Sequence, residues 1–292
     1  MTALNQANLG SLSIPVPSYD RSQVTVGIVH FGVGGFHRAH QAMYIDQLME
    51  QGKALDWGIC GVGVMPFDLK MKEAMQSQDC LYALVEKAPD GSWTPRIIGS
   101  IVQYLYAPDD PDAVIEKMAD PATRIVSLTV TEGGYNFNQV TGEFDDTNPA
   151  VQADLAPGAV PATTFGLITE ALVRRRARGI EPFTVMSCDN IQGNGHMAQE
   201  VFAAFARLRD PELGEWVEGN VLFPTPWSTA LPRSLLMTIE RRSANASASR
   251  MPGRWCASHS PNGRWKINSP PAARRWKMSA SRLCQTSCRM SS

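Results

Sequence analysis

A glycine-rich segment at residues 32–40 carries the most specific chemical signal in this 292-residue sequence. It reads GVGGFHRAH, follows an apolar, β-branched run at residues 24–31 and precedes a stretch with helical spacing. Glycines between a strand and a helix permit a tight turn and let backbone N–H groups approach a pyrophosphate. This context predicts a dinucleotide-binding loop. Its predicted cofactor-binding residues are Gly32, Gly34, Gly35, Phe36, His37 and Arg38.

The segment departs from the GxGxxG fingerprint at the third glycine position, which is His37. Ala39 is then the small residue that allows the helix to pack closely on the strand. His30, His37 and His40 lie close together in the sequence. A zinc site would need a further ligand, so we favour polar residues that contact the cofactor or the packed loop, and we predict no metal site.

Asp68 is the only acid near the end of the second apolar run, residues 57–64. In dinucleotide-binding folds an acid at this place accepts hydrogen bonds from the ribose hydroxyls. The alternative is an ordinary cap for the next helix. No arginine follows this strand to bind a 2′-phosphate, which favours NAD over NADP.

Two further polar residues follow predicted buried strands. Glu132 comes after residues 124–130, and Asn190 comes after residues 183–187. Ligands gather beyond the carboxyl ends of strands in open α/β sheets. Glu132 is therefore either a proton-relay carboxylate or a loop acid beside two glycines. Asn190, taken alone, is a turn former or helix cap, although Asn194 suits that role better.

Apolar runs and helical patterns alternate along residues 24–187. They predict strands at 24–31, 57–64, 124–130 and 183–187, and helices at 38–49, 67–75 and 164–178. Residues 81–86 and 95–106 are expected to form a hairpin around Pro89-Asp90-Gly91. Alternating strands and helices favour an α/β fold with a doubly wound, Rossmann-like parallel sheet covered on both faces.

Composition narrows the class of protein. No apolar run of about 18 residues is present, so no membrane span is expected. The N-terminus does not have the pattern of a secretory signal. Six cysteines without zinc-like or CxxC spacing suggest reduced thiols and a cytoplasmic protein.

The charge of the chain changes abruptly after Pro224. Residues 225–292 contain 12 Lys and Arg against one acid, Glu240, together with 13 serines and four of the seven tryptophans. Residues 1–224 contain 15 basic and 27 acidic residues. We therefore divide the chain into a domain at 1–224 and a basic, Ser/Arg-rich tail at 225–292.

Four segments of the first part resemble the polyol-specific long-chain dehydrogenases, the family of mannitol 2-dehydrogenase. They are GVGGFHRAHQAMYIDQL, DWGICGVGV, RIVSLTVTEGGY and FTVMSCDNIQGNG. The resemblance implies an NAD-dependent oxidoreductase that interconverts a sugar alcohol and its ketose without a metal. It implies a monomer whose small-molecule substrate is mannitol, arabinitol, sorbitol or a uronate-derived sugar acid.

The resemblance also implies a catalytic arrangement. Asn190 matches the asparagine of the family's SCDN motif, whose amide donates to a developing alkoxide. The family's lysine base and a histidine belong to a helical C-terminal domain, on a stretch like K-x-x-x-L-N-x-x-H. No such stretch follows Lys266 or Lys277, so we expect this domain to be missing and the chain to be inactive.

The sequence of the tail resembles the product of a gene that is translated in the wrong reading frame. With permitted codons, residues 225–233 read from the third base give A-M-V-D-R-I-T-P, which resembles the family's continuation. We therefore predict a frameshift after Pro224 and a disordered tail. The alternative is a non-catalytic NAD-binding fragment with a basic tail of incidental nucleic-acid affinity. The sequence of the tail shows no pattern of an amphipathic helix, so we expect neither specific nucleic-acid binding nor membrane binding.

Overall fold

The computed structural model describes residues 3–137, 143–225, 257–258 and 266–267. The chain divides into two compact units, Met1–Leu84 with Arg96–Pro232, and Val85–Pro95 with Arg233–Ser292. The first unit contains every predicted site residue. In the second, β8 (Ala257–Ser258) pairs antiparallel with β9 (Lys266–Ile267). The rest of the predicted tail beyond Thr225 lies outside the described residues.

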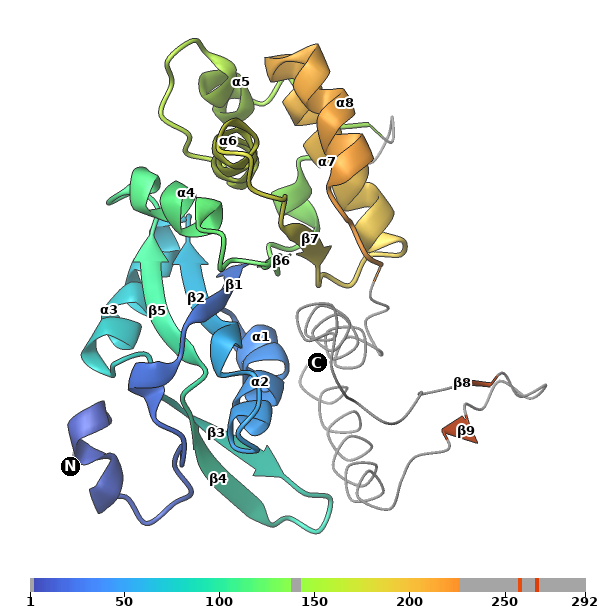
Figure 1. The fold of residues 1–292 in the computed structure, drawn as a ribbon. Helices are drawn as coiled ribbons and strands as arrows, with labels where there is room; N and C mark the ends of the chain where they lie inside the picture. The colour runs from blue at the N-terminus through green and yellow to red at the C-terminus, as the bar shows by residue number, and fades with distance from the viewer. Residues whose placement is uncertain (1–2, 138–142, 226–256, 259–265, 268–292) are drawn as a thin grey trace. The chain divides into compact units, whose positions relative to one another are not determined.

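A five-stranded parallel sheet forms the centre of the first unit (Figure 1). Its strand order is β5-β2-β1-β6-β7, and each neighbouring pair is parallel. The strands are β1 (Val26–Phe31), β2 (Gly58–Gly63), β5 (Ile101–Tyr106), β6 (Ile125–Leu128) and β7 (Thr184–Ser187). Most of their residues are fully buried. This topology confirms the predicted doubly wound, Rossmann-like fold.

Helices connect the strands and pack along the sheet. They are α1 (Gly35–Ala39), α2 (Gln41–Met49), α3 (Leu69–Ser77), α4 (Pro111–Ala119), α5 (Pro149–Leu155), α6 (Thr164–Ala177), α7 (Asn194–Arg209) and α8 (Pro211–Asn220). Figure 1 shows α3 and α4 beside β5 at one edge of the sheet, and α7 beside β7 at the other. Helix α8 packs on α7, and α6 packs on α4.

Short 3-10 helices fill several of the connections. They are η1 (Gln6–Ser11), η2 (Arg21–Gln23), η3 (Leu55–Trp57), η4 (Pro66–Asp68) and η5 (Glu132–Tyr135). The helix predicted at 67–75 begins only at Leu69, because η4 precedes it. The helix predicted at 38–49 is broken at His40, where the backbone leaves the helical region.

The prediction that residues 95–106 form one hairpin strand is wrong. The segment is split into β4 (Trp93–Ile98), which pairs with β3 (Tyr82–Lys87), and β5, which joins the parallel sheet. Polar contacts hold the break. The Gly99 amide donates to Asp46 Oδ1 at 2.8 Å, and the Ser100 hydroxyl donates to the Ala42 carbonyl at 2.6 Å. These contacts tie the break to α2, so the chain turns there into the sheet.

Cys60, Cys80 and Cys188 are buried and form no disulfide. Within the described ranges, no helix is both long enough and apolar enough to cross a bilayer.

Candidate functional site

The strand order places a topological switch point between β1 and β6. The chain builds outward from β1 through β2 to β5, then returns to lay β6 on the other side of β1. The connections on the two sides therefore diverge at the carboxyl ends of these two strands. A crevice of this kind is where open α/β sheets bind their ligands.

Gly32 forms the turn at the carboxyl end of β1. Its φ is +86°, a conformation that glycine adopts without steric cost. A side chain at this position would collide with the carbonyl oxygen of Thr129, which follows β6. The Gly34 amide donates to the Gly32 carbonyl at 2.7 Å and closes the turn. The residue type at position 32 is therefore fixed by the close approach of the two strand ends.

The next residues present backbone to the surface. Gly34 and Gly35 are exposed, and a Cβ added to Gly35 would meet no atom within 4 Å. Gly34 is the N-cap of α1 and has no side chain to satisfy the first amides of that helix. A phosphate can approach such amides closely. The loop therefore fits the pyrophosphate of a dinucleotide.

The three side chains that follow point in different directions. Phe36 is 42% exposed and stacks on His40, with ring centroids 4.3 Å apart. His37 is buried. Arg38 donates to Met71 Sδ at 3.3 Å, and its guanidinium lies 5.9 Å from the ring centre of Tyr82. The side chains of His37 and Arg38 therefore contact the protein itself, which agrees with the packed-loop alternative.

Asp68 lies just beyond the carboxyl end of β2. Its Oδ2 accepts the amides of Val64 and Met65, each at 2.9 Å. Asp68 thus closes the turn of η4 and makes no capping bond to α3. Gly63 permits this arrangement, because a side chain there would lie 2.6 Å from the Asp68 Cβ. One oxygen of the Asp68 carboxylate therefore holds the loop after β2, and the other oxygen makes neither of these bonds.

Glu132 begins η5, shortly after the last residue of Ile125–Leu128. Its side chain lies outside the described part of the chain. The preceding residue, Thr131, has a φ of +64° and a ψ of 169°, which a β-branched residue seldom adopts. Such a backbone costs roughly 1–3 kcal/mol and persists only where neighbours enforce it.

Asp189 supplies that enforcement. Its carboxylate accepts the Thr131 amide at 2.9 Å and the Val130 amide at 3.2 Å. The Tyr135 hydroxyl donates to the same carboxylate at 2.8 Å and lies 2.6 Å from Ser187 Oγ. Burial, reinforced by the Asp189 charge, raises the pKa of Tyr135 well above its ordinary value, so it stays a donor. Sequence reasoning missed Asp189, although it stands beside the chosen Asn190.

Asn190 is exposed directly after this buried carboxylate. Asn194, the first residue of α7, holds the turn around it. The Asn194 side-chain amide donates to the carbonyls of Ser187 and Asp189, each at 3.1 Å. The helix cap is Gly193, so Asn194 braces the turn rather than capping the helix. Asn190 is therefore an exposed residue that lies three positions after the end of β7.

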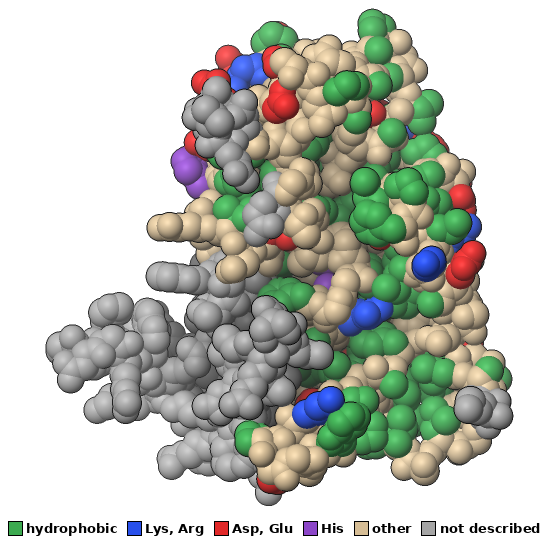
Figure 2. Space-filling model, turned by 180° about the vertical axis from the view of Figure 1, so that it is seen from behind, with side chains coloured by type: hydrophobic (Ala, Val, Ile, Leu, Met, Phe, Trp, Pro, Cys, Tyr) green, Lys and Arg blue, Asp and Glu red, His purple; other side chains and the backbone are tan. Residues whose placement is uncertain are grey.

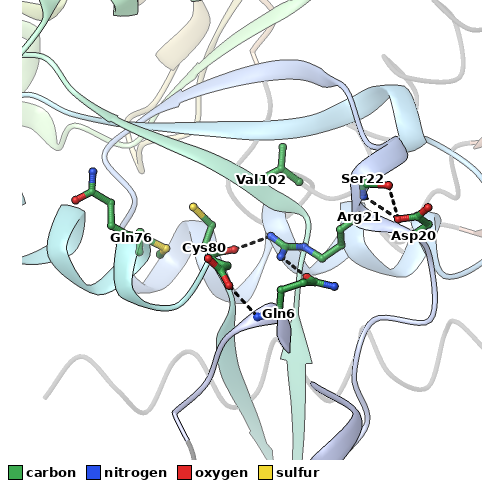
Figure 3. A pocket seen from close by; sticks show the side chains of 9 residues that line it. Gln6, Asp20, Arg21, Ser22, Gln76, Cys80 and Val102 are labelled. Carbon is green, nitrogen blue, oxygen red and sulfur yellow. Dashed lines mark hydrogen bonds between the residues drawn. The ribbon is translucent and has the colours of Figure 1, made fainter. Parts of the chain in front are cut away.

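A separate pocket lies near the amino end of β5 (Figure 3). Arg21 crosses it and donates to the carbonyls of Asp79, Gly99 and Ile101 at 2.8–3.0 Å. The Gln6 side chain accepts a fourth bond at 2.8 Å. The guanidinium therefore ties the N-terminal segment to the sheet and has little left to offer a ligand. The strand ends remain the better candidate site.

Among the described side chains, no group of three or more His, Cys, Asp or Glu could hold a metal ion.

An open parallel sheet with a glycine turn at its switch point defines a Rossmann-type α/β domain. The sequence identifies it more closely. The model of the mannitol dehydrogenase Rossmann domain matches residues 26–227, so the chain belongs to the mannitol dehydrogenase family.

Two relatives illustrate the similarity. The polyol:NADP oxidoreductase of Gluconobacter oxydans is 51% identical over 214 residues, which are 73% of this chain and 44% of that protein. The mannitol 2-dehydrogenase of Neosartorya fischeri is 50% identical over 230 residues, 76% of this chain and 46% of that protein. The chain therefore spans about half the length of these relatives.

Solved structures agree. Pseudomonas fluorescens mannitol 2-dehydrogenase, in a ternary complex with NAD and D-mannitol, superposes with a TM-score of 0.74 at 46% identity, covering 77% of this chain and 46% of that one. A substrate-free D-sorbitol dehydrogenase superposes with a TM-score of 0.72 at 44% identity, covering 85% and 51%. The likeness thus extends from sequence to fold, again over about half of each larger protein.

Proposed function

We propose that residues 1–224 form the NAD-binding half of a polyol dehydrogenase that interconverts a mannitol-like sugar alcohol and its ketose. The observation that carries this proposal is the glycine turn at the switch point, where Gly32 packs against Thr129 and Gly34 and Gly35 lie open to solvent. NAD would accept the hydride from the sugar alcohol. The similar Pseudomonas enzyme was solved in a complex with NAD and D-mannitol, which supports this choice of cofactor and substrate.

The proposal gives tasks to the start of α1, Asp68, Asn190 and Glu132. The amides of residues 35 and 36, at the start of α1, would bind the pyrophosphate, and Asp68 would accept hydrogen bonds from the ribose hydroxyls. Asn190 would donate to the substrate oxygen as negative charge develops there, and Glu132 would relay the proton. The resemblance assigns proton removal to a lysine with a neighbouring histidine, which we do not find in residues 225–292. We infer that this chain binds the cofactor without catalysing the reaction.

Fluorescence titration of the 292-residue chain with NADH tests the binding. We expect saturable binding that Gly34→Asp abolishes, because a carboxylate there would face the pyrophosphate. Gly10→Asp is the matched control, since Gly10 is exposed and a Cβ there meets nothing within 4 Å. Equal NADH affinity of Gly34→Asp and the parent chain would contradict the assignment of the loop.

A further inference from the structure

A buried polar cluster lies beneath the glycine loop, and the proposed function does not use it. We name it the histidine cluster; its members are His30, His37, Gln41, Ser127 and Thr129. His30 belongs to β1, Ser127 to β6, His37 to α1 and Gln41 to α2. His30, His37, Gln41 and Ser127 are each at most 2% exposed. Burial of so many polar groups is costly unless they bond to one another.

Hydrogen bonds connect the cluster to the glycine turn. The ring nitrogens of His30 lie 2.8 Å from Ser127 Oγ and 3.0 Å from Thr129 Oγ1. The Thr129 hydroxyl donates to the Gly32 carbonyl at 2.6 Å. The same carbonyl lies 3.2 Å from His30 Nε2. The cluster therefore holds the first glycine of the loop from below.

The two imidazole rings stack face to face. The ring centroids of His30 and His37 are 3.5 Å apart, with an angle of 12° between the planes. His37 Nδ1 lies 3.0 Å from Gln41 Oε1, which also accepts from the Ser127 hydroxyl at 3.1 Å. Helix α1 thus contacts β1 through the stacked rings of His37 and His30.

The two histidines are uncharged and do not form a metal site. Burial lowers the pKa of His30 to about 3 and that of His37 well below its ordinary value, and the nearby positive charge of Arg38 lowers the pKa of His37 further. Both rings are therefore neutral near pH 7. Parallel rings do not direct their nitrogens toward one point, so the pair does not form a metal site.

His37 occupies the third glycine position of the GxGxxG pattern, counted from Gly32 and Gly34. In that fingerprint the third glycine lets the helix approach the strand directly. Here a ring fills the space instead. We propose that His37 is a positioning residue: its ring, stacked on His30, sets the distance between α1 and β1 and so orients the loop amides toward the pyrophosphate. The proposal rests on the proposed function.

His37→Gly tests the proposal sharply, because it completes the GxGxxG pattern. We expect it to weaken NADH binding by about tenfold or more, since α1 loses its support. We also expect the Gly34 amide to exchange faster with deuterium in the variant without cofactor. Leu172→Ala is the matched control: it removes buried apolar contacts on α6 and should leave both readouts unchanged.

His37→Phe keeps a ring in the stack and should bind NADH within about threefold of the parent chain. It keeps the test decisive if His37→Gly does not fold. A tenfold loss in His37→Phe would overturn the claim that the ring sets the spacing. So would unchanged NADH affinity and unchanged Gly34 exchange in His37→Gly. If the parent chain binds no NADH, the proposed function fails, and Gly34 exchange still decides whether His37 positions the loop.

Discussion

At the scale of the residue, the site depends on which side chains face the ligand and which support the backbone. Gly32 could be predicted, because a strand followed by glycines has few other interpretations. The burial of His37 could not be predicted, because a histidine at the start of a helix can point either into the protein or toward a ligand. The role of Asp189 was equally hidden, since its partners Val130 and Thr131 are distant in the sequence.

Asp68 gives a prediction about cofactor choice. Asp68→Asn keeps an oxygen that can accept the Val64 and Met65 amides and removes the charge. The loss of charge should narrow the preference for NADH over NADPH by roughly tenfold to a hundredfold, measured as a ratio of dissociation constants. Asp68→Ala, which also removes the loop contact, should narrow it at least as much. An unchanged ratio in both variants would leave Asp68 with a purely structural role.

The buried histidines predict a pH dependence of stability. His30 has a folded pKa of about 3, against an ordinary value of 6.5. The unfolded chain therefore takes up the proton first, and stability falls as the pH drops from 6.5 toward 3. Each such histidine contributes a slope of about 1.4 kcal/mol per pH unit.

Thermal unfolding between about pH 7 and pH 4 measures this slope. His37→Phe removes one of the two titrating rings and should make the dependence shallower. The two chains differ only at residue 37, so the difference between their curves reports His37. Parallel curves for the parent chain and His37→Phe would mean that His37 is not buried in its neutral form.

At the scale of the element, some features could have been predicted and others could not. Helices α4, α5 and α8 were not predicted, although each begins with a proline that follows an Asp or Asn N-cap, a start signal that the sequence displays. The division of residues 95–106 could not be predicted, because Asp46 and Ala42, which hold the break, come from a distant helix.

The strained turn before η5 gives a test at this scale. Thr131→Gly should raise stability by about 1 kcal/mol, because relief of the strain outweighs the added flexibility of the unfolded chain. The midpoint of thermal unfolding should then rise by about 2–4 °C. Thr147→Gly, at an exposed position without positive φ, should lower the midpoint. A lower midpoint for Thr131→Gly would show that the turn is not strained.

At the scale of the whole molecule, the family match and the open sheet cover about half the length of the relatives. Hydrophobic side chains reach the surface over much of the face seen in Figure 2. Phe67 is 71% exposed and Leu222 is 62% exposed. Exposed apolar side chains favour association with a further domain or with other copies. We therefore expect this chain to aggregate more readily than one in which the predicted frameshift after Pro224 is reversed.

Our central proposal is that this chain binds NAD but does not catalyse the reaction, because we do not find the family's lysine base in residues 225–292. Mannitol-dependent reduction of NAD, measured in parallel for the 292-residue chain and for a chain with the reading frame corrected after Pro224, tests it directly. Loss of a positioned base alone typically costs about a hundredfold to ten-thousandfold, and loss of substrate orientation adds to this. We predict no measurable turnover by the 292-residue chain and clear turnover by the corrected one. Ordinary dehydrogenase rates from the 292-residue chain would contradict this claim.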